Sequence, residues 1–341
     1  MDTIVEYIWL DADNNFRSKT KIMKNRLIVN IDQLPTWNYD GSSTNQATTE
    51  SSEVILRPIF MCNDPFRLRN HKLAYCGTYD VSGNPLSNNH FENADSVFDC
   101  IDTAHYQPWF GMEQEFFIFD SLTNAPINFD INNTQGKYYC SVDQHPSREK
   151  YIMEEFIERA LHTGVLVCGI NAEVAQGQWE FQVGPCQGIL IGHHMMIARY
   201  ILNRVAHAHS CFIDYSPKAL GNDWNGSGCH TNYSTKFTRC GDENKSGLDV
   251  IYEYISELEK VHSEMMKSYG DGNETRMSGS CETASYNVFT HSVGGRNTSI
   301  RIGNDVANNT YGYFEDRRPA SNCDPYLVSS LIFYHTCTKH D

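Results

Sequence analysis

About one third of the way along its length, the chain reads Gly111-Met112-Glu113-Gln114-Glu115-Phe116-Phe117. The alternation of apolar and polar residues predicts a β-strand, in which successive side chains point to opposite faces. Glu113 and Glu115 would then share one face, roughly 6.6 Å apart along the strand, while Met112 and Phe116 would face the core. Two carboxylates beside apolar surface raise each other's pKa unless a cation intervenes. An isolated pair of this kind more often lies on the solvent-facing side of a strand. Other acidic residues are therefore needed to distinguish such a surface from a functional site.

Two more glutamates occur in similarly apolar surroundings. Glu173 follows the predicted strand Val165–Ile170, and Glu180 alternates with Trp179 and Phe181 on another. Four such carboxylates could be unrelated surface residues, but their repeated placement in nearly continuous apolar sequence favours a shared, metal-filled cavity. Ligand sets rich in oxygen, with an occasional imidazole, suit Mg²⁺ or Mn²⁺ rather than zinc.

An imidazole is available in the segment Trp224–Asn232, which alternates glycine with polar residues and contains His230. Its glycines would let the backbone approach a ligand closely, although most Gly-rich loops are only turns. The rival histidines are His193, His194, His207 and His209. They lie on a predicted amphipathic helix at spacings that do not share one face, so we interpret them as packing or surface residues.

The composition excludes several classes of protein. Among 341 residues, 42 acidic and 27 basic side chains give a formal net charge of −15, which disfavours binding to nucleic acids. No apolar run approaches the roughly 18 residues of a membrane span, and the N-terminus lacks a basic-then-apolar signal pattern. The 12 cysteines are scattered and never form Cys-x-x-Cys, so we expect reduced thiols in a cytoplasmic protein.

The length predicts about two domains, and a turn at Ser82–Pro85 is a candidate boundary between residues 1–85 and 86–341. The first part contains short β-like stretches, which are Ile4–Leu10, Leu27–Ile31, Glu53–Phe60 and Lys72–Thr78. In the second part, strands alternate with helices expected at Ala94–His105, from Ser147 to a Gly164 cap, at His193–His209, at Ser246–Tyr269 and from Pro325 onward. This pattern is typical of an α+β protein.

The C-terminal third supplies positive charge. Arg276, Arg296 and Arg301 lie among Gly, Ser and Asn residues, and the pair Arg317-Arg318 follows. Such arginines are often ion-pair partners of nearby acids, but near loops of small residues they also neutralise phosphate groups. The chain contains no G-x-x-x-x-G-K-S/T phosphate loop. Metals together with arginines therefore indicate phosphoryl transfer from ATP on a different scaffold.

Together, these motifs resemble those of glutamine synthetases, specifically the compact eukaryotic (type II) branch. The matching stretches are Trp37–Thr44, Asp64–Arg67, Pro108–Glu115, Asn171–Val174, Gln178–Pro185, Trp224–Asn232, Arg296–Ile302 and Tyr313–Pro319. The resemblance implies a small N-terminal β-grasp-like domain at residues 1–85. It also implies a catalytic domain of the ATP-guanido-kinase-like type at residues 86–341, with a curved antiparallel sheet flanked by helices.

The resemblance further implies ATP-dependent ligation of ammonia to L-glutamate through a γ-glutamyl phosphate, with two or more Mg²⁺ or Mn²⁺ ions. One ion would be held by Glu115, Glu173 and Glu180, and another by Glu113, His230 and Glu315. The implied catalytic residues are Asp40, Glu282, Arg296 and Arg317. In these roles, Asp40 would deprotonate ammonium, and Glu282 would lie on a flap that excludes water.

The resemblance also assigns the substrate contacts. Glutamate would meet Asn225, Gly226, Arg276, Arg296 and Arg317. ATP would meet Trp109, Asn232, Ser234 and Arg301. Ammonium would meet Asp40, Ser43 and Tyr139. In this family the equivalent of Asp40 comes from the neighbouring subunit, which implies active sites between protomers of a homodecamer made of two stacked pentameric rings.

One departure from the family pattern leaves alternatives open. Cys281 stands in the flap where a histidine is usual. This change is compatible with a ligase that joins glutamate to an amine other than ammonia, although retention of Asp40, Ser43 and Tyr139 favours ammonia. A non-catalytic scaffold is the other alternative, but retention of all six metal ligands argues against it, because unused polar groups destabilise an apolar interior.

Overall fold

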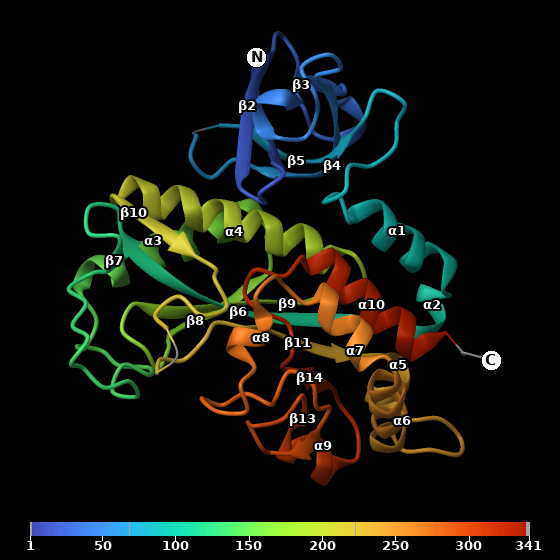
Figure 1. The fold of residues 1–341 in the computed structure, drawn as a ribbon. Coiled ribbons are helices and arrows are strands. Elements are labelled where there is room, and N and C mark those ends of the chain that lie inside the picture. The colour runs from blue at the N-terminus through green and yellow to red at the C-terminus, as the bar shows by residue number, and fades with distance from the viewer. Residues whose placement is uncertain (1, 68, 222, 339–341) are drawn as a thin grey trace.

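The computed structural model describes residues 2–67, 69–221 and 223–338. It contains two sheets with helices between and around them (Figure 1). The smaller sheet is N-terminal and has the strand order β2-β1-β5-β4-β3. Its strands are β1 Thr3–Leu10, β2 Phe16–Met23, β3 Trp37–Asp40, β4 Glu53–Asn63 and β5 Lys72–Tyr79. The β1–β5 pair is parallel and the other three pairs are antiparallel.

The expectation of a β-like stretch at Leu27–Ile31 is wrong. Those residues are irregular and lead into the short 3-10 helix η1, Ile31–Gln33; a second one, η2, spans Gly41–Thr44. Asn30 and Gln33 form a capping box, in which each side chain accepts a backbone N–H at the start of η1. These local hydrogen bonds favour a helical turn over an extended strand.

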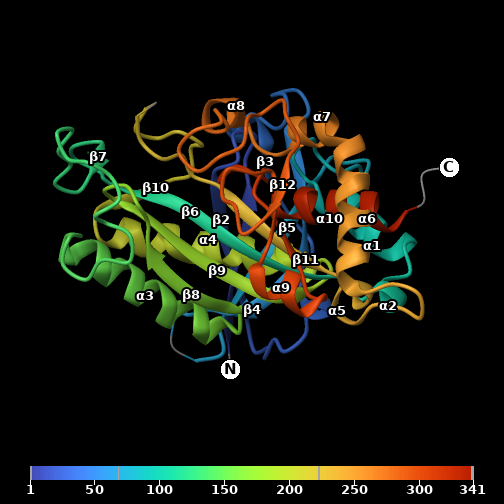
Figure 2. The same ribbon diagram turned by 90° about the horizontal axis from the view of Figure 1, so that it is seen from below.

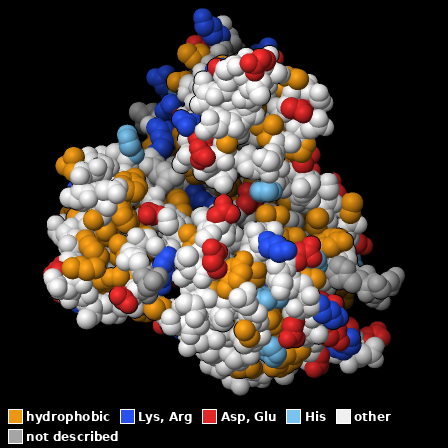
Figure 3. Space-filling view, viewed as in Figure 1, with side chains coloured by type: hydrophobic (Ala, Val, Ile, Leu, Met, Phe, Trp, Pro, Cys, Tyr) orange, Lys and Arg blue, Asp and Glu red, His pale blue; other side chains and the backbone are white. Residues whose placement is uncertain are grey.

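The sequence analysis missed β2, which forms one edge of the smaller sheet. Its side chains are mostly charged or small and at least partly exposed, so the strand lacks an apolar stripe. Figure 3 shows Lys and Arg side chains gathered on this side of the sheet, where β2 contributes Arg17, Lys19 and Lys21. Charged residues on an edge strand discourage pairing with another chain.

The smaller sheet buries both of its faces. On one face Val5, Tyr7 and Trp9 form a separate apolar core with residues of β4 and β5. On the other face Ile8 and Tyr75 join the main core of the molecule. That core includes α4, Leu190–Ala208, which lies between the two sheets in Figure 1. The division of the chain at residue 85 stays a prediction.

The larger sheet has the order β12-β13-β14-β11-β6-β9-β8, and β7 and β10 also pair with β6. Its strands are β6 Trp109–Asp120, β7 Ala125–Pro126, β8 Val167–Ala172, β9 Gln178–Gln187, β10 Cys211–Asp214, β11 Cys229–Ser234, β12 His291–Val293, β13 Ile300–Ile302 and β14 Phe314–Asp316. All neighbours are antiparallel except β12 and β13. Figure 2 shows β6, β9 and β8 side by side. This architecture confirms the predicted α+β class with a largely antiparallel second sheet.

The helices flank and connect the sheets. They are α1 Phe91–Cys100, α2 Thr103–Tyr106, α3 Ser147–Thr163, α4, α5 Lys236–Cys240, α6 Gly247–Lys260, α7 His262–Met265, α8 Asn273–Arg276, α9 Asn304–Asn309 and α10 Pro325–Cys337, with the 3-10 helix η3 at Met266–Ser268. Gly164 caps α3 with a φ of 84°, and Asp324 caps α10, as predicted. The helices expected at Ala94–His105 and Ser246–Tyr269 are instead broken into shorter segments.

Two details of the helices bear on the function classes. His193 and His194 on α4 are buried, which agrees with a packing role for them. Among the described residues, no helix combines the length and the apolar character needed to cross a membrane.

Candidate active site

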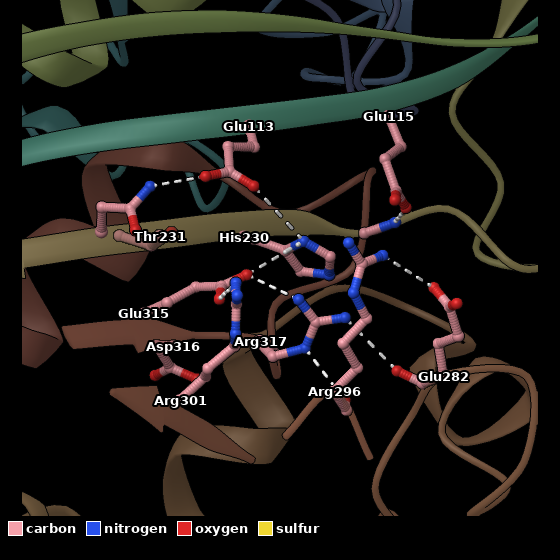
Figure 4. A network of polar contacts seen from close by, with 12 residues as sticks. Glu113, Glu115, His230, Thr231, Glu282, Arg296, Arg301, Glu315, Asp316 and Arg317 are labelled. Carbon is pink, nitrogen blue, oxygen red and sulfur yellow. Dashed lines mark hydrogen bonds and ion pairs between the residues drawn. The ribbon is translucent and has the colours of Figure 1, made fainter. Parts of the chain in front are cut away.

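Glu113, His230 and Glu315 form the first candidate metal cluster. They lie on the three adjacent strands β6, β11 and β14, and His230 is directly opposite Glu113 in the strand register. The His230 Nδ1 atom lies 3.8 Å from Glu113 Oε2 and 3.5 Å from Glu315 Oε1. One ligand atom from each residue falls within 4.8 Å of the others. Figure 4 shows the three side chains pointing toward one another.

Glu115, Glu173 and Glu180 form the second cluster. Glu115 on β6 is opposite Glu180 on β9, and Glu173 follows the end of β8, the next strand in the sheet. Their carboxylate oxygens also come within 4.8 Å of one another. The structure therefore brings together both sets of three side chains that the sequence analysis grouped, because residues two apart on β6 point to the same face.

The electrostatics of the second cluster favour a bound cation. Burial raises the pKa of Glu115 to about 7, that of Glu173 to about 8 and that of Glu180 to about 9, and the charge of Glu115 adds to the last two shifts. Like charges so close in a poorly solvated site cannot all ionise without a counter-ion. Five carboxylates and one imidazole are the donors that Mg²⁺ and Mn²⁺ accept, so the residues present fit these ions.

His230 is prepared to act as a neutral ligand. Burial lowers its pKa well below the usual value, and the positive charge of Arg317 lowers it further. A neutral imidazole keeps a lone pair free for a metal, whereas an imidazolium does not. The sequence analysis expected His230 in a loop, but it lies on β11, because Cys229–Ser234 pairs along β6.

Amide side chains support the carboxylates, and the sequence analysis did not assign them this role. Asn232 donates a hydrogen bond to Glu113 at 2.7 Å, and Asn171 donates one to Glu173 at 2.9 Å. Gln182 donates to Glu180, and the Gly228 N–H donates to Glu115 at 2.5 Å. The signal for Gln182 was present, since it shares a strand face with Glu180. Such contacts hold ligand side chains in a fixed orientation.

The predicted glutamate-binding residues lie next to the metal clusters. Arg276 is buried, burial lowers its pKa to about 10, and its Nη2 atom donates to the backbone carbonyls of residues 317, 318 and 319. A Cβ at Gly226 would lie 2.5 Å from Arg276 Cγ, and one at Gly228 would lie 3.0 Å from His230 Nε2. A Cβ at either position would force a neighbouring group to shift, so the backbone lies close to the Arg276 and His230 side chains; its close approach to a ligand stays a prediction. The Asn225 N–H donates to the Gln135 side chain at 2.8 Å.

Three arginines surround Glu315 and the flap. Arg317 and Arg301 lie 2.6 and 3.1 Å from the Glu315 carboxylate, and Arg296 lies 3.3 Å from the Glu282 carboxylate (Figure 4). The Arg317 side chain also donates to the Arg296 carbonyl at 3.1 Å. These guanidinium groups converge beside the first metal cluster, where they can neutralise a phosphoryl group.

The flap itself has an unusual backbone. Cys281 and Glu282 both adopt positive φ values, 52° and 63°, which cost free energy for residues other than glycine. Glu282 is half-exposed and its carboxylate pairs with Arg296. The effect of Cys281 in place of the usual histidine stays a prediction.

A pocket of about 590 Å³ adjoins the first cluster and contains most of the predicted ATP contacts. Trp109, Asn232 and Ser234 line it, whereas Arg301 lies outside the lining and pairs with Glu315. The sequence analysis missed Arg239, whose guanidinium lies 4.2 Å above the Trp109 ring and donates to Ser234 at 2.8 Å. Nothing in the sequence pointed to this role for Arg239, because the residue lies on α5, a short helix that follows β11 as a separate element.

The predicted ammonium residues divide into two places. Asp40 ends β3 in the smaller sheet, where Ser42 and Ser43 donate hydrogen bonds to its carboxylate. These bonds, chiefly that from Ser42, lower the pKa of Asp40. Tyr139 instead lies beside Arg296, with which it interacts. In Figure 1, β3 and β14 are at opposite ends of the molecule, with α4 between them.

Known proteins are similar to this chain in sequence and in fold. Residues 92–335 match the catalytic domain of glutamine synthetase. The chain is 45% identical to a glutamine-synthetase-like protein of Acanthamoeba polyphaga mimivirus, covering 98% of this chain and 94% of that one. It is 42% identical to glutamine synthetase cytosolic isozyme 1-3 of Arabidopsis thaliana, covering 96% and 93%. The fold matches ligand-free GmaS with a TM-score of 0.76 at 18% identity, over 98% of this chain and 77% of that one.

The GmaS similarity concerns the fold alone, because the sequence identity is low. The family match at residues 92–335 contains every residue of the two metal clusters, which lie between positions 113 and 315, and the match to the Arabidopsis thaliana isozyme covers 96% of this chain. On this basis, the chain belongs to the glutamine synthetase family.

Proposed function

We propose that this protein is an active glutamine synthetase, which joins ammonia to L-glutamate with ATP through a γ-glutamyl phosphate. The observation that carries the proposal is the adjacent pair of three-ligand clusters, Glu113–His230–Glu315 and Glu115–Glu173–Glu180. Buried carboxylates in such numbers destabilise a protein that binds no cation. A scaffold without catalytic activity would have no use for them.

Bound Mg²⁺ or Mn²⁺ would supply Lewis-acid polarisation and would neutralise the negative charge of the reacting groups. Glu115, Glu173 and Glu180 would hold the ion on the glutamate side. Glu113, His230 and Glu315 would hold the ion on the side of the transferring phosphoryl group.

The arginines and the pocket would bind and orient the substrates. Arg317 and Arg296 would neutralise the phosphoryl group, since they lie beside Glu315 and at the flap. Arg276, with Asn225 and Gly226, would hold glutamate. ATP would be bound by Trp109, Asn232, Ser234, Arg239 and Arg301.

Asp40 would take the proton from ammonium, and its lowered pKa keeps the carboxylate ionised. Asp40 ends β3 and Ser43 lies in the following helix η2, whereas Tyr139 lies beside Arg296. We therefore place Asp40 and Ser43 in the active site of a neighbouring subunit. The assembly would be a homodecamer of two stacked pentameric rings. The plant relatives are named cytosolic isozymes, and we place this enzyme in the cytoplasm as well.

A phosphate-release assay tests the proposal. Purified protein with Mg²⁺, ATP and glutamate should release phosphate only after ammonium is added, with one glutamine formed per phosphate. Release with methylamine but not with ammonium would favour the ligase for another amine, which Cys281 in the flap leaves open. No release with either amine would favour the scaffold.

A further inference from the structure

The motif Asp64-Pro65-Phe66-Arg67 has no role in the chemistry proposed above. It forms the turn that follows β4, where the buried Asp64 carboxylate accepts the Phe66 backbone N–H at 2.9 Å and pairs with Arg67. These contacts fix the turn and direct the Arg67 side chain toward Glu6 on β1. The turn lies where the smaller sheet meets α3 and α4.

Glu6 is at the centre of this contact, and groups from both sides bind its carboxylate. Its side chain is only 7% exposed. Arg67, from the smaller sheet, lies 2.7 Å from Oε2, and Arg204, from α4, lies 3.1 Å from the same oxygen. The Tyr200 hydroxyl, also on α4, donates to Oε1 at 2.5 Å. Burial by itself would raise the pKa of Glu6, but the hydrogen bonds and positive charges of these partners outweigh the effect of burial and lower the pKa. The carboxylate is therefore ionised at neutral pH.

Phe66 adds a second contact across the same boundary. The Arg204 guanidinium lies 3.9 Å from the centre of the Phe66 ring, and that of Arg159 on α3 lies 5.3 Å from it. Arg159 also donates to the Pro65 carbonyl at 2.6 Å. We call these groups the Glu6 clamp: Glu6, Pro65, Phe66 and Arg67 from the smaller sheet, and Arg159, Tyr200 and Arg204 from the helices.

The clamp is suited to setting an orientation rather than to adding stability. Desolvation of buried ions offsets most of their attraction, so buried ion pairs contribute little net free energy. Hydrogen bonds to a buried carboxylate are directional, however, and sliding the sheet over α4 would leave a charge without a partner. The surrounding apolar contacts, such as those of Ile8 and Tyr75, lack that directionality.

The smaller sheet connects the clamp to Asp40. Glu6 lies on β1, which pairs with β5, and β5 pairs with β4. β4 pairs with β3, and Asp40 at the end of β3 is directly opposite Glu53. A change in the angle of the sheet on α4 would therefore move Asp40 relative to the rest of its own chain, and so relative to the neighbouring subunit's site that it would serve. The metal clusters and the nucleotide pocket of the same chain lie on the larger sheet and would not move with it.

We propose that Glu6, Arg67 and Arg204 are positioning residues for the ammonium base, because they fix the orientation in which the smaller sheet presents Asp40. This inference rests on the proposed function, in which Asp40 deprotonates ammonium. It predicts a selective effect, since weakening the clamp should impair the use of ammonium more than the use of glutamate or ATP.

Steady-state kinetics of the Glu6→Gln variant test the inference. Glutamine keeps the size of the side chain and can still accept the Tyr200 hydrogen bond, but it removes the charge that both arginines share. We expect the KM for ammonium to rise about fivefold or more, with less than about a twofold change in the KM for glutamate and for ATP. The matched control is Glu257→Gln, since Glu257 pairs with Lys260 within α6, outside the clamp, and should leave all three KM values unchanged.

A second pair of variants separates positioning from folding. Arg204→Lys keeps a charge beside Glu6 and should shift the ammonium KM less than Arg204→Met does. If Glu6→Gln does not give folded protein, this pair decides by the same criterion. Equal changes in all three KM values, or an unchanged ammonium KM in folded variants, would overturn the inference while leaving the proposed function intact. A wild-type protein that does not use ammonium would overturn the proposed function, and the inference with it.

Discussion

Glu115 and Glu180 are directly opposite each other on the antiparallel strands β6 and β9. Burial raises the pKa of Glu115 to about 7 and that of Glu180 to about 9. The strand pairing therefore holds two acids where each disfavours ionisation of the other. A divalent cation bound between the two carboxylates would relieve this conflict.

Replacement of Glu180 by Gln should reduce the stabilisation that metal gives the protein, because one of the two clusters loses a ligand. A ligand present at one hundred times its Kd stabilises the folded state by about 2.7 kcal/mol. We expect Mn²⁺ to raise the Tm of the wild type by several degrees and that of Glu180→Gln by less, since the cluster of Glu113, His230 and Glu315 is intact in the variant. Without metal, the Tm of the variant should be equal to that of the wild type or higher. Differential scanning fluorimetry with and without EDTA checks this. Glu154→Gln, on the exposed face of α3, should behave like the wild type.

Replacement of Glu282 by Ala should uncouple ATP hydrolysis from glutamine formation. The Glu282 carboxylate pairs with Arg296, so its loss should admit water to the acyl phosphate. We expect more than one phosphate released per glutamine formed, against a ratio of one in the wild type. Parallel measurement of both products checks this. A ratio that stays at one would show that Glu282 does not shield the intermediate.

Replacement of Gly226 by Ala should weaken glutamate binding. The new Cβ would lie 2.4 Å from the Pro217 carbonyl oxygen and 2.5 Å from Arg276 Cγ, so the loop or the arginine has to shift. We expect the KM for glutamate to rise about tenfold, corresponding to about 1.4 kcal/mol of lost binding free energy. Gly111→Ala is the control, since its Cβ meets nothing closer than 3.7 Å. A glutamate KM that changes equally in both variants would contradict the prediction.

Replacement of Arg239 by Ala should weaken the binding of ATP without affecting the binding of glutamate. Its guanidinium lies 4.2 Å above Trp109 and holds Ser234, and a partly exposed cation–π contact contributes about 0.5–1 kcal/mol. We expect the KM for ATP to rise roughly threefold to fivefold. Lys236→Ala, an exposed position on the same short helix, is the matched control. An unchanged KM for ATP would show that the pocket binds ATP without Arg239.

His193 should make the folded protein less stable at acidic pH. Burial lowers its pKa to about 3, from about 6.5 in the unfolded chain, so between these values the unfolded state binds more protons. Above pH 6.5 the neutral His193 does not lower the free energy of unfolding. As the pH falls below 6.5, protonation of this residue in the unfolded chain lowers that free energy, by about 2 kcal/mol at pH 5.

Urea unfolding at pH 7.5 and pH 5 checks the His193 prediction. The wild type should lose more stability on acidification than His193→Gln does. His207→Gln, an exposed position on the same helix, should lose as much as the wild type. Equal losses in the wild type and His193→Gln would show that the buried histidine does not contribute to acid sensitivity.

Local features of the structure could be predicted because their causes lie within a few residues. Gly164 ends α3 because a left-handed cap needs no Cβ, and Asp324 with Pro325 begins α10 through a single side-chain hydrogen bond. The alternation around Glu113 and Glu115 likewise determined which side chains share a face of β6. The capping box at Asn30 is also a local feature, but it was not predicted, because the apolar residues of Leu27–Ile31 indicated a β-strand instead.

The sequence by itself therefore determined the class of fold, the family and the residues that form the two candidate metal clusters, because side-chain period and motif are properties of short segments. Only the tertiary structure decided that β9 lies beside β6, that His230 is on a strand, that Arg239 covers Trp109 and that Glu6 joins the smaller sheet to α4. These contacts join segments far apart in the chain, and the burial of the whole core selects them. No short segment contains that information.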